Sequence, residues 1–578
     1  MASSLPNDCL ADIFEILSED KLTLYSCLLV NRQWCKSVVP FLWRKPFDLL
    51  KYLTYNKLST RHPKLIHSYV ACLSEEERGM LIKNGINIPT DFPPTTFEYS
   101  TFLRYLDISE LYHAASLWCM YIDCIYPVTG DDDEKVNNSS TRYPECVGCI
   151  GPYTAMRIKL KRGPVKRRQR QAEQDVRKSV DLTELMLNQT QPPPTGKVYL
   201  VWQSLCKMFM RRCLLLRYLC ITSPYRQPDD YYMVSAYPNA IKCLSHLQYF
   251  ECGGRFLKSQ VLETIAKVCR HLQTIKYYMY PKENNQMTMS EVNSLIALIQ
   301  IQNSLSEFII IRGGTQLGNI IMALGRSQAT SLKRLEFIRC DFEHFNWLKE
   351  LSTFTKLKEL IFDGCRNLSN NLISTLDTSS SFPRLTLLKS LNGILSADVW
   401  NALIRNSGSS LQMLDTGRGM SSGLWQDHMR VLETIGLYCP NITHFTSYTF
   451  VGVTPKLFDT IGGFHQLEEL IIALDRFSEY EGRGLCVNKF LTLLATHLAP
   501  TVKFLHVITK KPCNVDSLRA FIEKFRGKFK YFGMKELWDV DVDTYARIFK
   551  ELNNVLLPLD MYSSRIREIK TPGIFLCR

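Results

Sequence analysis

Apolar residues recur along most of this chain in a short unit, Leu-x-x-apolar-x-apolar, whose first residue is usually leucine. The alternation within each unit predicts a short β-strand with one buried face. Twelve copies begin at the following anchor positions: Leu216, Leu247, Leu272, Leu305, Leu332, Leu357, Leu385, Leu411, Ile442, Leu467, Val502 and Phe529. Neighbouring anchors lie 25 to 35 residues apart, with a mean near 28. That period predicts a solenoid of stacked repeats.

The segments between the strands carry helical patterns that lead into the next anchor. The sequence VLETI occurs at 261–265 and at 431–435, and each copy is followed by a cysteine, Cys269 or Cys439, shortly before the next anchor. The most regular copies, 332–342 and 357–376, carry Cys340 and Cys365 eight residues after their anchors. These copies resemble the cysteine-containing leucine-rich repeats. Residues 197–558 are therefore expected to form a curved α/β solenoid.

The repeat pattern also predicts which strand residues face away from the core. Anchor leucines point inward, so the fourth and sixth residues after each anchor are expected on the exposed, concave face. Several of these are apolar: Ile309, Ile311, Ile338, Ile361 and Leu391. We hypothesise that this stripe receives a target protein or is covered by the C-terminal tail, residues 559–578. The alternative is a register shifted by one residue, which would place the same side chains in the core.

The first 47 residues have a different, helical pattern. Leu10, Ile13, Phe14 and Leu17 form one apolar face, and Pro6 and Asp8 suit the start of that helix. A second apolar run extends from Leu22 to Trp34, and a third ends at Leu42-Trp43. Three helices of this size cannot bury so many large side chains alone, so part of their apolar surface is expected to face a partner.

The order Leu-Pro, Asp, Leu, Ile-Phe, Leu, Leu, Val, Arg-x-Trp and Leu-Trp-Arg over residues 3–47 resembles the F-box family. Asp8 stands where that family more often has Glu. The resemblance implies a three-helix F-box that docks on the adaptor Skp1 and, through it, on a cullin and a RING subunit. Its apolar signature falls on Leu5, Pro6, Leu10, Ile13, Leu17, Leu28, Val30 and Trp34, some of which must form the motif's own core. The alternative is a helical hairpin that caps a larger fold.

Residues 48–127 read as a helical linker between the F-box at 1–47 and the repeats, whereas residues 128–196 read as a polar and basic insertion without stable structure. Within the insertion, residues 157–178 hold ten Lys or Arg against two acids, a local charge of +8 out of the chain's +14. This run could be a nuclear localisation signal, a nucleic-acid contact or a solvated charge run. It lacks interleaved aromatic residues, which makes nucleic acid an unlikely partner.

Candidate chemistry is sparse. The 20 cysteines are scattered through apolar stretches, as at Cys220 and Cys252, and are expected to be small buried side chains. The pair Cys146 and Cys149 provides only half of a zinc site. The sequence has no Gly-rich phosphate loop, H-E-x-x-H or G-x-S-x-G motif. We expect neither an enzyme nor a cofactor or metal.

The sequence also lacks a secretory signal and an apolar run of membrane-spanning length, so a cytoplasmic or nuclear location without membrane contact is expected. Together these patterns favour the substrate-recognition subunit of a Skp1–cullin–F-box ubiquitin ligase, whose repeats bind an unknown target protein. Two alternatives stay open. One is a Skp1-binding scaffold without a role in degradation, and the other is a nuclear leucine-rich-repeat binder that uses residues 157–178.

Overall fold

The computed structural model describes residues 5–47, 61–88, 95–125, 195–222, 233–254, 259–279, 289–343, 347–368, 382–392, 395–417, 425–449, 454–474, 487–508 and 515–535 except 526, 528 and 529. The basic run 157–178, the Cys146–Cys149 pair and the tail 559–578 lie outside the described residues. The chain forms two compact units, unit 1 (Met1–Asn303) and unit 2 (Ser304–Arg578). None of the described helices is both long and apolar enough to cross a membrane.

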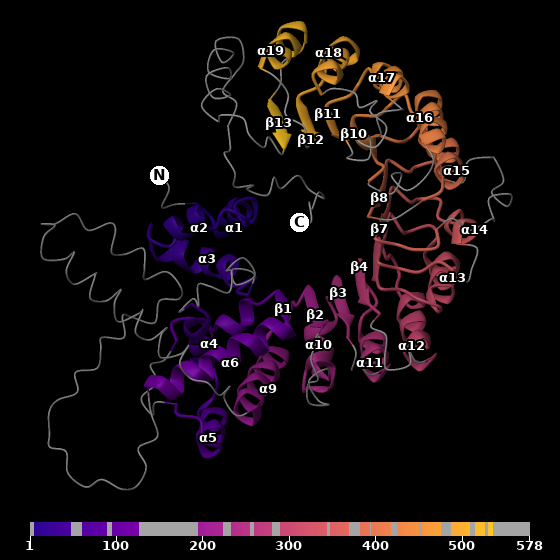
Figure 1. The fold of residues 1–578 in the computed structure, drawn as a ribbon. Coiled ribbons are helices and arrows are strands. Elements are labelled where there is room, and N and C mark those ends of the chain that lie inside the picture. Colours follow the sequence, from indigo (N-terminus) through magenta and orange to yellow (C-terminus); the bar gives the residue numbers. More distant parts are fainter. Residues whose placement is uncertain are drawn as a thin grey trace, which may run out of the picture. The chain divides into compact units, whose positions relative to one another are not determined.

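Unit 1 begins with a three-helix unit made of α1 (Asn7–Ile16), α2 (Lys21–Cys27) and α3 (Arg32–Leu42), in which α3 packs against both other helices (Figure 1). Phe14 is buried at its centre, with the rings of Trp34 and Phe41 edge-on at 5.5 and 5.9 Å. The sequence predicted one helical run from Leu22 to Trp34, but the structure divides this run between α2 and α3. It breaks before Asn31, whose side chain caps α3 by accepting the Trp34 N–H.

The next elements of unit 1 are α4 (Arg61–Ala71), α5 (Glu75–Lys83), η3 (Tyr99–Phe102), β1 (Tyr105–Asp107), α6 (Ile108–Ile125) and α9 (Thr195–Arg212). The range 48–127, expected to be helical, therefore also contains a strand. β1 pairs with β2 in parallel, and the side chains of Leu103 before it, Leu106 within it and Ile108 directly after it are fully buried. The first repeat thus begins at Leu103, ahead of the insertion.

Unit 1 continues with β2 (Tyr218–Thr222), η5 (Val234–Ala236), α10 (Ala240–Leu244), β3 (Tyr249–Gly253), α11 (Ser259–Val268), β4 (Thr274–Tyr278) and α12 (Met289–Gln300). Strands β1 to β4 pair in parallel and in chain order. Each of these strands has one face on the core, since Leu219, Phe250 and Ile275 are completely buried.

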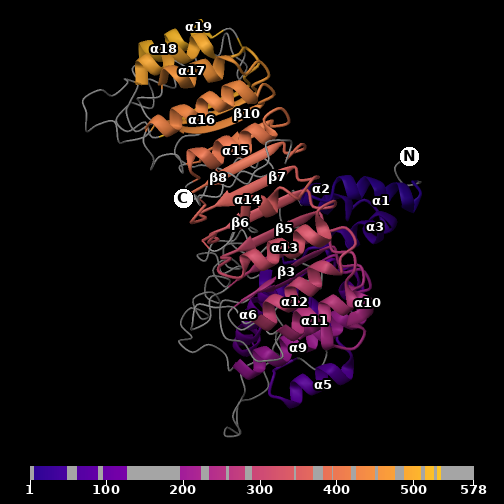
Figure 2. The same ribbon diagram turned by 90° about the vertical axis from the view of Figure 1, so that its right-hand side faces the viewer.

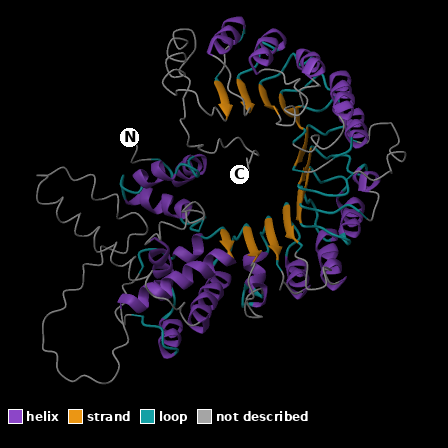
Figure 3. Ribbon diagram, in the orientation of Figure 1, coloured by secondary structure: helices purple, strands orange, loops and turns teal. Residues whose placement is uncertain are grey.

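Unit 2 repeats the same helix–strand alternation. Its elements are β5 (Glu307–Ile311), α13 (Leu317–Gln328), β6 (Arg334–Ile338), α14 (Trp347–Leu351), β7 (Glu359–Asp363), β8 (Leu387–Leu391), α15 (Ala397–Ser407), β9 (Met413–Asp415), α16 (Trp425–Tyr438), β10 (His444–Thr449), α17 (Thr454–Gly462), β11 (Glu469–Leu474), α18 (Val487–His497), β12 (Phe504–Ile508), α19 (Val515–Lys524) and β13 (Tyr531–Lys535). Neighbouring strands pair in parallel. The helices lie on one face of this sheet, the face turned to the viewer in Figure 2, as Figure 3 also shows.

The anchors confirm the expected solenoid. The eleven anchors from Leu216 to Val502 are each at most 1% exposed, and each lies two residues before a strand. Phe529 lies outside the described residues. The two VLETI segments lie in α11 and α16, as the pattern predicted. Burial of each anchor leucine contributes about 1.5–3 kcal/mol to the free energy of unfolding. The anchors are therefore a large part of the apolar core within each unit.

Candidate functional site

The three-helix unit leaves several large apolar side chains in solvent. Of the eight residues expected at the adaptor contact, Pro6 is exposed and Val30 is 51% exposed. Five are half-buried, namely Leu5, Ile13, Leu17, Leu28 and Trp34. Leu10 is fully buried and belongs to the core of the unit, so it cannot contact a partner directly. A unit of 43 residues with this much exposed apolar surface is suited to a protein contact.

The sequence pattern missed the most exposed apolar residues of this unit. Ile16 is 84% exposed, Leu29 is 75% exposed and Leu22 is 65% exposed. A signal for them was available, because Ile16 lies off the helical stripe that Leu10 and Phe14 bury. An apolar residue on the polar side of an amphipathic helix does not add to the core of the three-helix unit.

The three-helix unit is joined tightly to the rest of unit 1. The Arg44 carbonyl accepts hydrogen bonds from the N–H groups of Arg104 and Tyr105, both at 3.0 Å, at the start of β1. The Trp43 ring stacks on Tyr99 with centroids 4.0 Å apart and meets Tyr69 edge-on at 5.4 Å. Within unit 1, this aromatic joint leaves the helical unit and the first repeat little freedom to rotate about each other.

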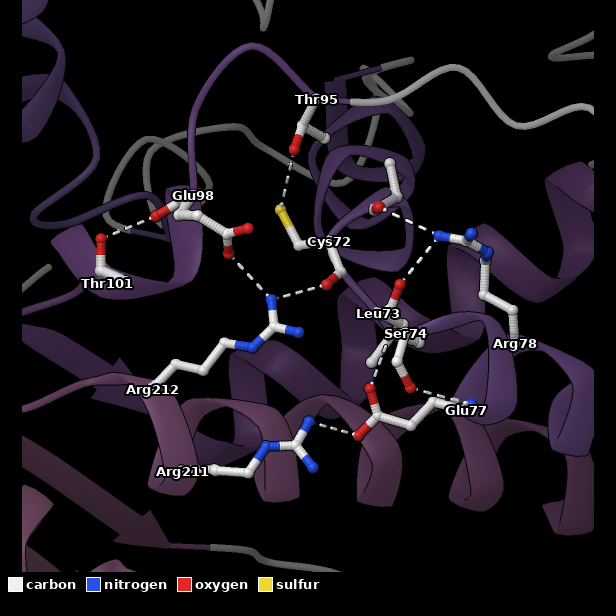
Figure 4. Close-up of polar contacts among 11 residues, drawn as sticks. Cys72, Leu73, Ser74, Glu77, Arg78, Thr95, Glu98, Thr101, Arg211 and Arg212 are labelled. Atoms are coloured by element: carbon white, nitrogen blue, oxygen red, sulfur yellow. Dashed lines mark hydrogen bonds and ion pairs between the residues drawn. The ribbon is translucent and has the colours of Figure 1, made fainter.

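Two arginines at the end of α9, Arg211 and Arg212, bind groups of the linker, as Figure 4 shows. Arg211 pairs with Glu77 at 2.6 Å, and Arg212 donates to the Cys72 carbonyl at 2.6 Å and to Glu98 at 2.9 Å. Burial alone would raise the pKa of Glu77, but the Ser74 N–H and Arg211 outweigh it and lower that pKa. The Arg211–Glu77 ion pair connects α5, in the linker, with α9, which precedes β2.

The face of the unit 1 sheet opposite the buried anchors carries a column of half-buried tyrosines. Strand register sets Tyr105, Tyr218 and Tyr249 side by side on β1, β2 and β3. Their rings stack, with centroids 5.5 Å apart for the first pair and 4.5 Å for the second. The Lys45 ammonium lies over the Tyr105 ring at 4.3 Å from its centroid. We name this feature the tyrosine column. Aromatic side chains held rigidly at a surface are favourable contacts for proteins.

A buried carboxylate holds the tyrosine column in place. Glu251 is only 8% exposed and accepts from the hydroxyls of Tyr218 at 2.8 Å and Tyr278 at 2.7 Å. The Lys276 ammonium lies 3.0 Å from the same carboxylate, and the Tyr249 hydroxyl lies at 3.5 Å. Burial alone would raise the pKa of Glu251, but the charge of Lys276 and the two tyrosine hydroxyls lower it below its usual value. Glu251 therefore stays ionised at neutral pH.

Four of the five residues of the predicted apolar stripe in unit 2 are partly exposed. Ile309, Ile311, Ile338 and Leu391 are half-buried on the face of the strands opposite the anchors. Ile361 differs from the expectation of an exposed residue, because it is only 6% exposed. The strand pairing puts Ile311 beside Ile338 and Ile309 beside Glu336. The half-buried stripe is therefore shorter than the sequence suggested and is centred on β5 and β6.

The described residues hold no cluster of three or more His, Cys, Asp or Glu side chains arranged to bind a metal ion. The described cysteines of the repeats, among them Cys220, Cys252, Cys340 and Cys365, are buried. Burial raises the pKa of the Cys252 thiol well above its ordinary value. These thiols are packing groups of the solenoid interior.

Residues 2–48 match the family model described as F-box-like. The chain carries an F-box-like domain, called the F-box from here on, at residues 2–48. The three-helix unit α1–α3 is that domain, and the buried anchors identify the described strands and helices that follow β1 as a leucine-rich-repeat solenoid. No curated protein sequence matches the chain. Among solved structures it is similar to the leucine-rich repeat-containing protein LegL7 from Legionella pneumophila, at 12% identity over 59% of this chain and 98% of that one, with a TM-score of 0.32.

Proposed function

We propose that this chain is the substrate-recognition subunit of a Skp1–cullin–F-box ubiquitin ligase. The F-box would dock on a Skp1-like adaptor, and through it on a cullin and a RING subunit, while the repeats bind a target protein. F-box and leucine-rich-repeat domains are typically non-catalytic interaction modules. The observation that carries the proposal is the exposed apolar surface of the F-box, led by Ile16 and Leu29. The proposal implies action in the cytoplasm or nucleus.

The aromatic joint supports this role. An adaptor accelerates ubiquitin transfer by holding a target lysine near the conjugating enzyme, so its effect depends on effective concentration. A flexible connection would spread the target over a large volume. In unit 1, Trp43, Tyr69 and Tyr99 lock the F-box to the linker and to the first strands. The F-box and the tyrosine column of unit 1 are therefore presented as one body.

Replacing Ile16 and Leu29 together with aspartate is expected to weaken Skp1 binding at least about 100-fold, because each change places a charge in a desolvated contact. Both residues are exposed, so the fold should be unaffected. Binding of purified Skp1 to the full chain, measured by isothermal calorimetry, checks this. Leu437→Asp on α16 is the matched control, since Leu437 is 79% exposed in unit 2. Absence of Skp1 binding by the unmodified chain contradicts the proposal.

The half-buried stripe on β5 and β6 is our candidate for target contact. Ile311→Asp together with Ile338→Asp is expected to leave the protein soluble and cooperatively folded, with a change in the free energy of unfolding of about 1 kcal/mol or less. Ile361→Asp is the contrasting variant, because that side chain is buried. It should cost about 3 kcal/mol or more. Both values come from urea denaturation.

The same variants test target capture in cells. Proteins that accumulate when the chain is removed should be depleted again by the unmodified chain but not by the Ile311→Asp, Ile338→Asp pair. If the pair restores depletion fully, the stripe is not the target contact. If nothing accumulates on removal, the chain is a Skp1-binding scaffold rather than a receptor for degradation.

A further inference from the structure

Two exposed leucines lie directly before the anchor of β2. Leu214 is 61% exposed and Leu215 is 42% exposed, in the segment that joins α9 to β2. The anchor that follows them, Leu216, is fully buried. Leu214 and Leu215 therefore add little to the core of unit 1 and place adjacent apolar side chains in solvent.

The solenoid does not need leucine at these two positions. In the ten later copies with described anchors, from Leu247 to Val502, the two residues before the anchor are polar or proline. In chain order these pairs are Ser-His, Arg-His, Asn-Ser, Thr-Ser, Thr-Lys, Pro-Arg, Ser-Ser, Pro-Asn, His-Gln and Pro-Thr. Because ten repeats keep the fold with such pairs, the leucines at 214 and 215 are not required by the repeat architecture.

The next repeat adds a third exposed aliphatic side chain. The other apolar residues of α10 are buried, whereas Ile241 is 67% exposed. α10 packs against α9, where the Cys243 Sγ lies 4.0 Å from the Phe209 carbonyl (Figure 1). The strands that follow these two helices, β2 and β3, pair directly. Leu214, Leu215 and Ile241 therefore lie on neighbouring repeats of unit 1.

Unbalanced positive charge accompanies these side chains. Residues 195–250 hold seven Lys or Arg against two acids, a net charge of +5. Lys197, Arg211 and Arg212 each pair with a carboxylate of unit 1. Three further cations of this segment are exposed and form no ion pair with any residue that the structure describes, namely Lys207, Arg217 and Lys242.

The three aliphatic side chains and the three cations together are named the α9–α10 patch. We propose that the α9–α10 patch binds an acidic amphipathic helix of a second protein. The apolar stripe of such a helix would cover Leu214, Leu215 and Ile241, and glutamates or aspartates on its flanks would face the cations. Complementary charge would also speed the encounter. The F-box and the strands take no part in this contact, so the inference goes beyond the proposed function.

The composition of the patch favours a protein helix over a membrane surface. Peripheral attachment by charge typically uses clusters of about four to eight basic residues, more than the three unpaired cations here. Three aliphatic side chains match the apolar stripe of a short helix, which presents about three to four apolar residues in two turns. The adjacent position of Leu214 and Leu215 gives such a stripe a continuous apolar contact.

Differential selection from a peptide library tests the patch. The probe is a phage-displayed library of peptides of about four helical turns, randomised over Ala, Leu, Ile, Gln, Glu and Lys. It is selected in parallel on the full chain and on the Leu214→Ser, Leu215→Ser, Ile241→Ser variant. Both proteins carry the basic run 157–178, so peptides that bind this run are retained by both.

We expect a set of peptides that the unmodified chain enriches at least about 10-fold over the triple serine variant. These peptides should carry net negative charge and apolar residues three or four positions apart. All three replaced side chains are exposed, so the melting temperature of the variant should be unchanged.

A charge variant tests the cations without touching the apolar side chains. Lys207→Gln with Lys242→Gln should weaken binding of the best synthetic peptide at least about fivefold at low salt, and less at high salt because ions screen the attraction. Fluorescence anisotropy of the labelled peptide measures this. The matched control is Arg326→Gln with Arg405→Gln, which removes two exposed cations from α13 and α15 of unit 2 and should leave binding unchanged.

Four outcomes overturn the proposal. The first is that no peptide prefers the unmodified chain to the triple serine variant, and the second is that the preferred peptides are neutral or basic. The third is a charge variant that binds the peptide as well as the control does. The fourth is that vesicles of phosphatidylcholine and phosphatidylserine, mixed at about 7 to 3, retain the unmodified chain but not the triple serine variant, which would make the patch a membrane contact.

Discussion

Glu251→Ala is expected to lower the free energy of unfolding of unit 1 by about 3–5 kcal/mol, the usual cost of breaking a buried charge pair by removing one partner. The variant leaves the Lys276 ammonium without its carboxylate at 3.0 Å. It also strips the hydroxyls of Tyr218 and Tyr278 of their acceptor. Hydrogen exchange of peptides covering β2, β3 and β4 reports this loss in the full chain, because it resolves unit 1 from unit 2.

Two controls isolate the carboxylate. Tyr249→Phe removes a hydroxyl that lies 3.5 Å from Glu251, at the limit of a hydrogen bond, so its cost should stay below about 0.5 kcal/mol. Tyr278→Phe removes a contact of 2.7 Å to a charged acceptor and should cost about 1.5–3 kcal/mol. If Tyr249→Phe and Tyr278→Phe lower the free energy of unfolding equally, the hydrogen bonds to Glu251 do not stabilise this face of the sheet.

The Glu251 network also predicts a pH dependence. The pKa of Glu251 is lower in the folded protein than its ordinary value of 4.5. Its contribution is therefore fully present above pH 4.5 and is lost as the pH falls through the folded pKa. Glu251→Gln cannot titrate, so stability measured between pH 6 and pH 3 should fall less steeply for this variant than for the unmodified chain.

Trp43→Ala is expected to cost about 3–5 kcal/mol, as other truncations of buried tryptophan and phenylalanine do. Trp43 is 5% exposed and fills the space between Tyr69 and Tyr99. Its loss opens a cavity between the F-box and the linker. Urea denaturation measures the cost, and faster hydrogen exchange in α4 and η3 would locate it at the joint.

Trp43→Ala distinguishes the packing inside the F-box from the packing of the F-box on the linker. Inside the F-box, Phe14 packs on Trp34 and Phe41. Trp43 packs instead on Tyr69 and Tyr99 of the linker. We therefore expect Trp43→Ala to retain Skp1 binding within about threefold at temperatures where it is folded. Phe97→Ala, at the half-buried edge of the same cluster, should cost about 1 kcal/mol or less. A cost below 1 kcal/mol for Trp43→Ala would mean that the F-box is not locked to the first repeat.

Much of the fold could be predicted because its signal is local and repeated. The anchor spacing located the repeats, and all eleven described anchors are buried two residues ahead of a strand. The same pattern is present at Leu103, Leu106 and Ile108, where it was overlooked. The insertion and two long helices separate that copy from Leu216, which hides it from a search by period. Anchor-based alignment from Leu103 would also have placed Tyr105, Tyr218 and Tyr249 in one row.

Other features depended on contacts between segments that lie far apart in sequence. Helical periodicity could not assign Leu10 to the core and Ile16 to the surface, because that choice depends on where α3 packs. The burial of Ile361, in contrast to Ile338 one strand away, likewise has no counterpart in the repeat pattern. The positive φ of Arg312 and of Arg339 could not be predicted either, since φ is a property of the folded chain.

The sequence by itself determined the architecture, because burying a leucine in each repeat is favourable wherever that repeat lies and because the F-box signature is contiguous. Only the tertiary structure decided the surfaces. It set the neighbours of Glu251, stacked Trp43 on Tyr99 and put Ile311 beside Ile338. The physical reason is that core formation depends on the apolar pattern of one repeat at a time. A binding surface depends on which side chains of different repeats the strand register brings together.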